Sequence, residues 1–327
     1  MESSSAAPRA PSRRRTLAYA ALAAVAVVGG TAGGTVYVKA QAHSGAGAVS
    51  SVSGSPSVSA SEEASVASVE AVAQPVVDQD ELLAEAMESV TVEDGAEVSV
   101  AVLDLASGAS ASYGDGLFDT ASIVKVDILA ALLLQAQDAG RELTAAEKSY
   151  ATAMIEHSDN TSASALWRTI GKAAGLDAAN ERLGLTDTEG GEDMLWGLTQ
   201  TTAADQLVLL QQAFGEEDSE LTEASRSYIQ RLMTRIAAGQ QWGVSAAAHG
   251  SAWALKNGWL PRSTTGLWDI NSIGRVTADG HGCLVAVLSD GNSTQAKGIS
   301  LVEAAARAAV SVVGDEGSTA SASASVS

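Results

Sequence analysis

The stretch from Ser122 to Ala136 is predicted to be a helix that is apolar on nearly every side. Its apolar residues are mainly valine, isoleucine and leucine, with three successive leucines at 132–134. A helix at the surface of a domain keeps one polar face, so a helix without one lies at the centre of a domain. Hydrophobic residues make up 46% of the chain, which is enough to supply a core around it.

The segments on either side of this helix follow the order helix, strands, helices, strands, helix. The other helices are predicted at 79–89, 145–156, 162–170, 173–183, 202–214, 221–235 and 298–313, and the strands at 97–103, 110–113, 251–257, 267–276 and 283–288. Two groups of strands around a helical middle predict a mixed α/β (α+β) fold. We expect the first and last segments to pack together around one antiparallel sheet.

The charge of the chain limits its partners. Its 327 residues include 19 basic and 39 acidic side chains, a net charge of −20, so we expect no nucleic-acid partner. The single cysteine, Cys283, excludes an intramolecular disulfide and a cysteine-rich zinc site. The four histidines have no metal-ligand spacing, and we expect neither a metal nor another cofactor.

The amino-terminal segment is typical of an export or membrane signal. Three arginines at 13–15 precede an apolar run over 16–38, which is long enough to span a bilayer. The positive cluster places the remainder of the chain on the far side of the membrane, which predicts an extracytoplasmic domain. Residues 12–17 resemble a twin-arginine signal, and Ala40-Gln41-Ala42 is an acceptable cleavage site. A cleaved signal peptide and a retained anchor both remain open.

These features divide the chain into five parts. They are a cytoplasmic basic segment (1–15), a signal peptide or transmembrane anchor (16–42), a Ser/Ala-rich linker (43–78), one folded domain (79–314) and a disordered tail (315–327). No internal repeat is evident, and we expect the protein to be a monomer.

The first of three short motifs is Ser122-Ile123-Val124-Lys125, at the start of the central helix. Residues three apart share a helix face, and a buried lysine with a lowered pKa can accept the serine proton as a neutral amine. The backbone N–H groups of the helix start can also bind an oxyanion. A helix-capping serine is the ordinary explanation, but a lysine in so apolar a helix needs a reason, because an unpaired buried charge is costly.

The second motif is Ser158-Asp159-Asn160, between two helical segments. All three residue types are common helix caps, which is its ordinary explanation. In the functional interpretation, Ser158 passes a proton to a leaving nitrogen and Asn160 donates a hydrogen bond to a substrate amide carbonyl.

The third motif is Lys256-Asn257-Gly258, which we expect at the end of a strand. Lys256 would hold a substrate carboxylate, and Gly258 would let the substrate backbone approach. The backbone N–H of Trp259 would join that of Ser122 as an oxyanion donor. The alternative is an ordinary strand-to-turn transition, where Asn-Gly is common.

In this order, the three motifs resemble the penicillin-recognising serine enzymes, and most closely the class A β-lactamase group. The resemblance covers most of 97–313 and includes 154–161 and 199–203. It implies a five-stranded antiparallel sheet flanked by helices, an all-helical subdomain, and an active site between them. It also implies Ser122 as nucleophile, Lys125 as acylating base, Ser158 as proton shuttle, and Asn160, Asn257 and the other third-motif residues as substrate-binding residues.

The chain departs from this family at two places. Asn257 stands where the family has Thr or Ser, so a hydroxyl that helps to bind the substrate carboxylate is missing. No E-x-x-L-N loop lies between the second motif and Thr199, although the Glu of that loop activates the deacylating water in class A β-lactamases. The segment 186–197 instead carries Asp187, Glu189, Glu192 and Asp193, which we interpret as a solvated acidic loop packed down by Trp196.

Three functions are compatible with these observations. The first is an exported or membrane-anchored serine hydrolase that forms an acyl-Ser122 intermediate with β-lactams or D-Ala-D-Ala-type cell-wall peptides and deacylates slowly. The second is a penicillin-binding or sensing protein that captures such ligands and turns over poorly. The third is an inactive scaffold, which the near-complete motif set disfavours.

Overall fold

The structure, a computed structural model, describes residues 78–323. The predicted basic segment, the signal or anchor segment and the linker up to residue 77 lie outside the described residues, as do the last residues of the tail. Among residues 78–323, no helix has both the length and the apolar character needed to cross a membrane.

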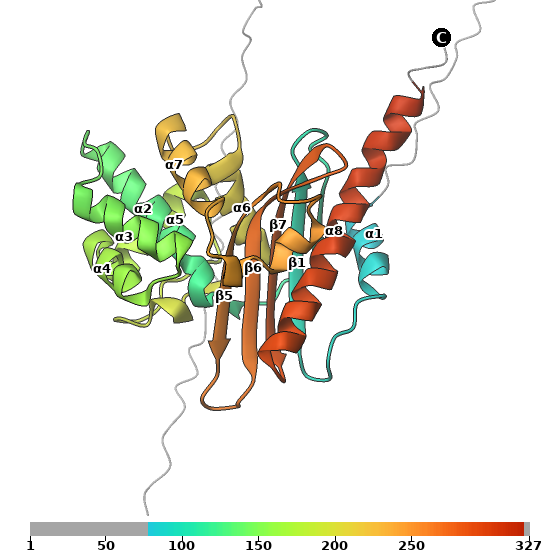
Figure 1. Cartoon of the computed structure of the whole chain (residues 1–327), viewed down its shortest axis with the longest axis horizontal. Helices are drawn as coiled ribbons and strands as arrows, with labels where there is room; N and C mark the ends of the chain where they lie inside the picture. The colour runs from blue at the N-terminus through green and yellow to red at the C-terminus, as the bar shows by residue number, and fades with distance from the viewer. Residues whose placement is uncertain (1–77, 324–327) are drawn as a thin grey trace, which may run out of the picture. The chain divides into compact units, whose positions relative to one another are not determined.

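The observed elements follow the predicted order (Figure 1). The helices are α1 (Gln79–Met87), α2 (Val124–Asp138), α3 (Ala145–Glu156), α4 (Asn160–Ile170), α5 (Lys172–Leu183), α6 (Ala203–Phe214), α7 (Glu223–Met233) and α8 (Gln295–Ser323). The strands are β1 (Glu97–Asp104), β2 (Ser110–Tyr113), β3 (Phe118–Asp119), β4 (Gln200–Thr201), β5 (Trp253–Pro261), β6 (Trp268–Ala278) and β7 (His281–Asn292).

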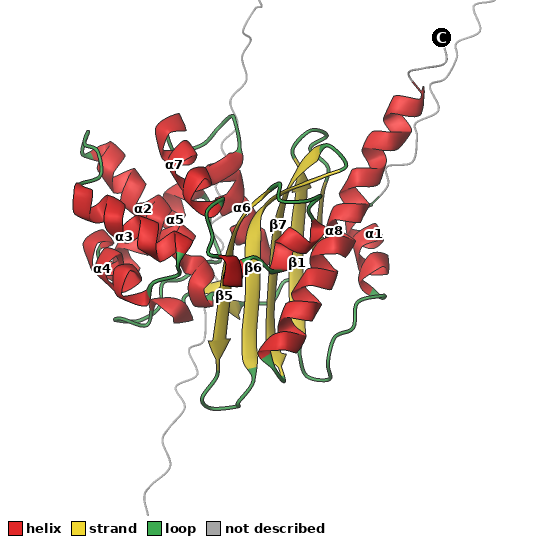
Figure 2. Cartoon of the chain, viewed as in Figure 1, coloured by secondary structure: helices red, strands yellow, loops and turns green. Residues whose placement is uncertain are grey.

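Five of these strands form one antiparallel sheet in the order β2-β1-β7-β6-β5. The predicted mixed α+β fold with a five-stranded antiparallel sheet is therefore confirmed. Strand β1, from the first part of the chain, pairs along its whole length with β7 from the last part. Helix α8 lies on one side of the sheet and α6 on the other, so the central strands are buried on both faces (Figures 1 and 2).

The second part of the molecule is a group of helices around α2 (Figure 2). Helices α3, α4, α5 and α7 all pack against α2, and its residues are buried almost without exception. This confirms the prediction of a central helix. Strand β5 has no strand partner on its outer side, and this free edge faces the helices.

Three boundaries differ from the sequence prediction in ways that matter for function. Ser122 lies in a short 3-10 turn, η1 (Ala121–Ile123), and α2 begins after it. Strand β5 continues to Pro261, because its pairing with β6 carries the chain through the Asn-Gly pair that locally favours a turn. Helix α8 continues to Ser323, since no proline follows Gly314 to end it.

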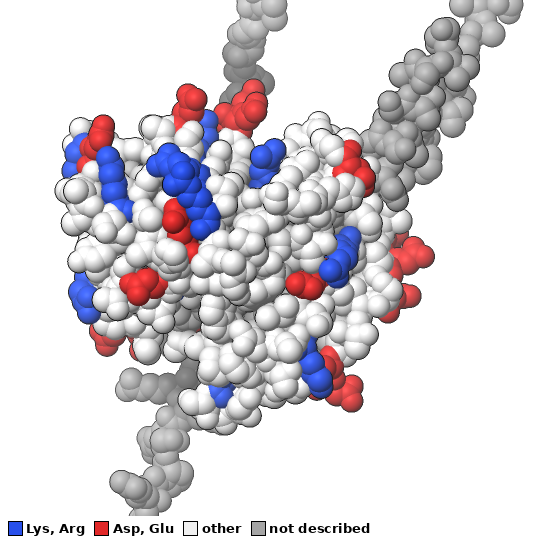
Figure 3. All heavy atoms as spheres, viewed as in Figure 1, with Lys and Arg blue, Asp and Glu red and all other residues white. Residues whose placement is uncertain are grey.

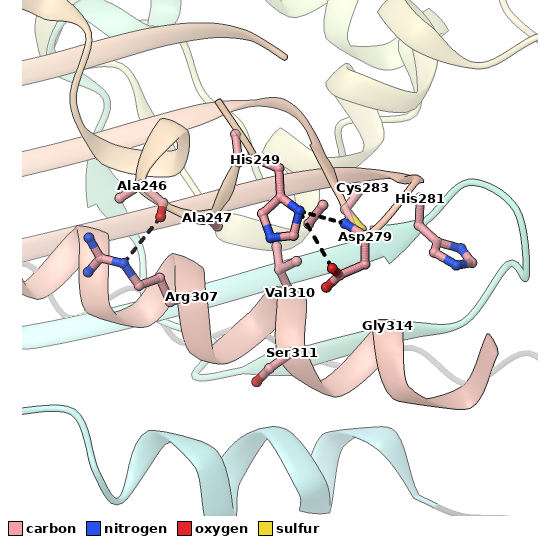
Figure 4. A pocket seen from close by; sticks show the side chains of 12 residues that line it. Ala246, Ala247, His249, Asp279, His281, Cys283, Arg307, Val310, Ser311 and Gly314 are labelled. Atoms are coloured by element: carbon pink, nitrogen blue, oxygen red, sulfur yellow. Dashed lines mark hydrogen bonds and ion pairs between the residues drawn. The ribbon is translucent and has the colours of Figure 1, made fainter. Parts of the chain in front are cut away.

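On the face shown in Figure 3, basic and acidic side chains are interspersed among wide uncharged areas. A cavity of about 630 Å³ lies between the turn joining β6 to β7 and helix α8, and none of the three motifs lines it (Figure 4). Cys283 lies in its wall, and burial raises the pKa of this thiol to about 12. The thiol is therefore protonated near neutral pH.

Candidate active site

The turn that carries Ser122 is fixed by its neighbours. The N–H of Thr120 donates to the carbonyl of Thr199, and β3 pairs with β4 just before the turn. From β6, the Asn271 side-chain amide donates to the carbonyls of Asp119 and Thr120 at 2.9 and 3.1 Å. Ala121 is held at φ +48°, a left-handed conformation that only a well-supported turn maintains in a residue with a Cβ.

The free edge of β5 approaches this turn so closely that only a glycine fits at Gly258. A Cβ there would lie 2.7 Å from the carbonyl oxygen of Thr120 and 2.9 Å from the backbone nitrogen of Ser122. The sequence predicted that Gly258 leaves room for a substrate backbone. The structure shows in addition that it leaves room for the nucleophile turn itself.

Lys125 is entirely buried on the first turn of α2. Its Nζ donates to the Ser158 carbonyl at 2.7 Å, the Ser158 Oγ at 2.9 Å and the Asn160 Oδ1 at 2.7 Å. Burial lowers the pKa of Lys125 to about 7, against the opposing effect of the Asp159 carboxylate. A substantial fraction of these amines is therefore neutral near pH 7, as a general base requires.

Lys125 makes no hydrogen bond to the Ser122 hydroxyl. Among residues 78–323, the Ser122 side chain makes no hydrogen bond, and it is half-buried. The first motif thus places the two groups on neighbouring turns of backbone, and the hydroxyl has to rotate toward the amine before a proton can pass.

Ser158 lies between two lysines. Its Oγ accepts from Lys125 at 2.9 Å and from Lys256 at 3.2 Å. These two bonds use both lone pairs of the hydroxyl, so its own proton is directed elsewhere. Ser158 also has φ +56°, a strained value that persists here because the surrounding contacts fix it.

Lys256 is entirely buried on β5 and donates a second bond to the carbonyl of Asn257 at 2.8 Å. Burial is the main cause that lowers the pKa of Lys256 well below its usual value, and the charge of Lys125 adds to it. An ammonium group has three N–H donors, so one remains for a ligand carboxylate.

The side chains of Asp159 and Asn160, at the start of α4, make different hydrogen bonds. The Asp159 carboxylate caps the helix by accepting from the N–H of Ser162 at 2.6 Å. The Asn160 Oδ1 is bound to Lys125, whereas its exposed amide N–H groups have no partner among the described residues. That they donate to a ligand carbonyl stays a prediction.

Asn257 does not reach the site, which corrects its prediction as a substrate-binding residue. Its side chain is completely buried and donates to the carbonyls of Gln240 and Trp242 at 2.8 and 2.9 Å. Its Oδ1 accepts from the Ser272 hydroxyl at 2.6 Å. Along a strand, side chains alternate between faces, so Asn257 points away from the face that Lys256 and Gly258 present to the nucleophile.

The acidic loop is arranged as the sequence predicted. Asp187, Glu189, Glu192 and Asp193 are all exposed. Trp196, in η2 (Trp196–Leu198), donates from its indole to the Ser164 hydroxyl at 3.1 Å and lies with its ring centre 5.0 Å from the Lys125 Nζ. An aromatic ring, and no carboxylate, therefore covers the loop side of Lys125 within the described chain.

Two contributors to this site were not anticipated from the sequence. Asn271 supports the nucleophile turn, and the signal that could have revealed it is an amide flanked by isoleucines within a predicted strand, Ile270-Asn271-Ser272-Ile273. The contact of Trp196 with Lys125 had no signal in the sequence, because it depends on how a loop folds over a helix more than sixty residues away in the chain.

Comparisons with solved structures agree with this architecture. PBP-A has a TM-score of 0.62 at 20% identity over 72% of this chain and 96% of its own, and the acyl-enzyme complex of a PBP-A variant with penicillin G has 0.61 at 21% over 72% and 97%. The TLA-1 extended-spectrum β-lactamase has 0.62 at 15% over 72% and 98%. A class A β-lactamase from Bacteroides cellulosilyticus has 0.61 at 15% over 73% and 99%. No curated protein sequence matches the chain.

This fold is shared with PBP-A and with class A β-lactamases. The sequence model of the beta-lactamase enzyme family matches residues 134–313, more than half of the chain, and the chain belongs to that family. The matched residues include the second and third motifs but begin after Ser122 and Lys125.

Proposed function

We propose that the protein is an exported or membrane-anchored serine hydrolase that forms an acyl-Ser122 intermediate with β-lactams or D-Ala-D-Ala-type peptides. The observation that carries this proposal is the buried Lys125, with a pKa of about 7, bonded to Ser158 and Asn160 beside the Ser122 turn. An amine of that pKa can exchange protons at neutral pH, which a structural lysine has no need to do.

Acylation follows from these groups. Neutral Lys125 accepts the Ser122 proton as the Oγ attacks the amide carbon, and the oxyanion binds the backbone N–H groups of Ser122 and Trp259. When the carbon–nitrogen bond breaks, Ser158 gives its proton to the leaving nitrogen and takes one from Lys125, to which it is already bonded. Lys256 holds Ser158 in place and attracts the ligand carboxylate with its remaining N–H.

The acidic loop offers no base for deacylation that is buried as Lys125 is. The loop acids are exposed, and Trp196 lies against Lys125 on that side. This observation favours the second candidate function, a penicillin-binding or sensing protein that retains the acyl group for a long time. The two candidates share the acylation step and differ only in the rate of the second step.

The test is labelling with a penicillin-type probe, followed by intact-protein mass spectrometry. Wild-type protein should gain the mass of one probe, and Ser122→Ala should gain none because the nucleophile is absent. Ser300→Ala, which removes an exposed serine hydroxyl of α8, is the matched control and should label normally. Labelling of Ser122→Ala would refute the assignment.

Export remains part of the proposal because of the arginines and the apolar run near the amino terminus. Residues 1–78 fused to a phosphatase that is active only outside the cytoplasm should give activity, and replacing Arg13 and Arg14 with lysine should reduce it if the twin-arginine route is used. A fusion without activity would contradict export.

A further inference from the structure

The indole of Trp196 lies over Lys125, beside the Ser122 turn. Its ring centre is 5.0 Å from the Lys125 Nζ. The next residue, Gly197, lies against the turn, since a Cβ there would be 3.8 Å from the carbonyl oxygen of Ala121. Lys125 is completely buried, whereas Trp196 is half-buried and reaches the surface. The indole therefore separates the amine from solvent on the side of the acidic loop.

Two indole hydrogen bonds hold this part of the acidic loop on α4. Trp196 donates from the loop to the Ser164 hydroxyl of α4 at 3.1 Å. In the opposite direction, Trp167 of α4 donates to the loop carbonyl of Asp193 at 2.7 Å, and Trp167 is completely buried. The loop is thus bonded to the helix from both sides, and these bonds fix the ring over Lys125.

The charged groups that act on Lys125 come from other elements. The Asp159 carboxylate at the start of α4 favours the ammonium form, and Lys256 on β5 carries a like charge. On α2 itself, Asp127 is bound to Gln206 of α6. Within residues 78–323, the acidic loop places no charged side chain in hydrogen-bond or ion-pair contact with Lys125. The contact that the loop does make with Lys125 is the indole.

The indole has two opposite effects on the protonation of Lys125. Its ring face attracts an ammonium, which raises a pKa by roughly one. By excluding water, it disfavours the ammonium, and burial as a whole lowers the pKa of Lys125 from 10.5 to about 7 against the attraction of Asp159. The exclusion of water is the larger effect, so removal of the ring should raise the pKa of Lys125.

We propose that Trp196 is a positioning residue that keeps water away from Lys125 and thereby prolongs the life of the acyl-enzyme. The inference rests on acylation at Ser122. Once the leaving nitrogen has taken its proton, Lys125 is neutral again and has the lone pair of a base.

Hydrolysis of the ester would use that lone pair. A water oxygen would bond to the acyl carbon while Lys125 takes one of the water protons. The bond between the acyl carbon and the Ser122 Oγ would then break, and Lys125 would return the proton to the Oγ, leaving a free carboxylic acid. The ring over Lys125 limits this step, because a water has to lie beside the amine for its proton to pass.

The experiment compares Trp196→Ala with wild type in two measurements. The first is the lifetime of the penicillin adduct by intact-protein mass spectrometry at about pH 9, where Lys125 is neutral in both proteins. The second is the pH at which the acylation rate constant is half of its maximum. Trp196→Ala should shorten the lifetime about tenfold and raise that pH by about one, because water then reaches the amine. A merely structural role would not move the pH midpoint.

Two variants serve as controls. Trp196→Phe keeps an aromatic ring but loses the bond to Ser164, and its adduct lifetime should stay within about threefold of wild type. Trp253→Ala removes another half-buried indole, at the start of β5, and should match wild type in both measurements.

The titration of Lys125 is also followed without any ligand, by NMR of protein that carries carbon-13-labelled lysine, with Lys125→Arg identifying the signal. Trp196→Ala should raise this pKa by about one. An unchanged adduct lifetime or an unchanged pKa overturns the role of Trp196 but leaves acylation at Ser122 intact. Failure of the probe to label wild-type protein overturns the function of Ser122 and, with it, the effect of Trp196 on the adduct.

Discussion

At the scale of single residues, the proposed mechanism depends on the protonation state of Lys125. Its pKa is lowered to about 7 by burial, so the neutral form predominates above that value and the charged form below it. An ammonium uses three N–H donors, whereas the neutral amine has two and a lone pair. When Lys125 loses its proton, it therefore gives up one of its three donated hydrogen bonds to Ser158 and Asn160. The lone pair on its Nζ can then accept a hydroxyl proton.

We expect the acylation rate constant to rise with pH and to reach half of its maximum at about pH 7, the pKa of Lys125. Lys125→Arg keeps the charge but cannot be neutral, and should slow acylation by about 10²- to 10⁴-fold without that midpoint. Stopped-flow measurement with a chromogenic β-lactam across two pH units on either side tests this. An unchanged rate in Lys125→Arg would remove Lys125 from the role of base.

In the proposed mechanism, Lys256 both holds Ser158 in place and attracts the ligand carboxylate, and one substitution can separate these two roles. Lys256→Ala should lower acylation by carboxylate-bearing ligands about tenfold or more, and should affect an ester without a carboxylate less, because the lost interaction is a charge-assisted hydrogen bond. The rates for both ligands are measured side by side. Lys256→Met, which keeps most of the side-chain volume, controls for the cavity. Equal losses for both ligands would show that Lys256 acts only through Ser158.

At the scale of elements, helix α2 is joined to α6 by a buried carboxylate. Asp127 accepts from the Gln206 amide at 3.2 Å, while its Oδ2 and the Gln206 Oε1 have no partner among the described residues. Burial raises the pKa of Asp127 to about 7, and the nearby Asp205 carboxylate adds to the effect. A protonated Asp127 could donate from its Oδ2 to the Gln206 Oε1, whereas an ionised Asp127 leaves these two oxygens without a donor.

We expect stability to depend on pH through this group. The folded pKa is higher than the unfolded one, so folding takes up a proton between the two values, and the stabilisation present below about pH 4 is lost as pH rises through about 7. Asp127→Asn can donate to Gln206 at every pH and should be more stable than wild type near pH 8, by on the order of 1–3 kcal/mol.

Urea unfolding of both proteins at several pH values from about 5 to 8 measures this difference. The difference in the free energy of unfolding between Asp127→Asn and wild type should increase with pH in that interval. Asp138→Asn, which changes an exposed carboxylate at the end of the same helix, is the matched control and should follow the wild-type pH dependence. If the difference in the free energy of unfolding between Asp127→Asn and wild type did not change with pH, Asp127 would not be the source of the pH dependence.

At the scale of the whole molecule, the proposed function places acylation at the edge of β5 that faces the helices, where the acidic loop offers only exposed carboxylates for hydrolysis of the ester. We expect a burst of about one product per enzyme followed by a slow steady state, because the loop carboxylates are exposed to solvent and Trp196 lies against Lys125 on that side. Stopped-flow hydrolysis of a chromogenic cephalosporin with quenched mass spectrometry measures both phases.

Glu189→Gln and Glu192→Gln test whether the acidic loop contributes to that second phase. Both side chains are exposed, and neither substitution should change the steady-state rate by more than about twofold. Fast, linear turnover without an accumulating adduct would show that an efficient base exists, and a large loss in either variant would identify it.

Much of this protein was determined by local sequence. The uninterrupted apolar surface of α2 predicted its central position, because a helix without a polar face has to be buried. The alternating strands and their placement at both ends of the folded domain predicted one antiparallel sheet. The candidate residues Ser122, Lys125, Ser158 and Asn160 were predicted from short motifs whose order along the chain resembles that of the penicillin-recognising serine enzymes.

The directions of the buried polar side chains were decided only by the tertiary structure. Lys125 bonds to Ser158 and Asn160, thirty-three and thirty-five residues away, and not to Ser122 on the preceding turn of backbone. Asn257 turns toward Gln240 and Trp242, and Trp196 folds over Lys125. A buried donor has to find an acceptor, and the nearest available acceptor depends on which segments the fold brings together, so motif spacing cannot specify it.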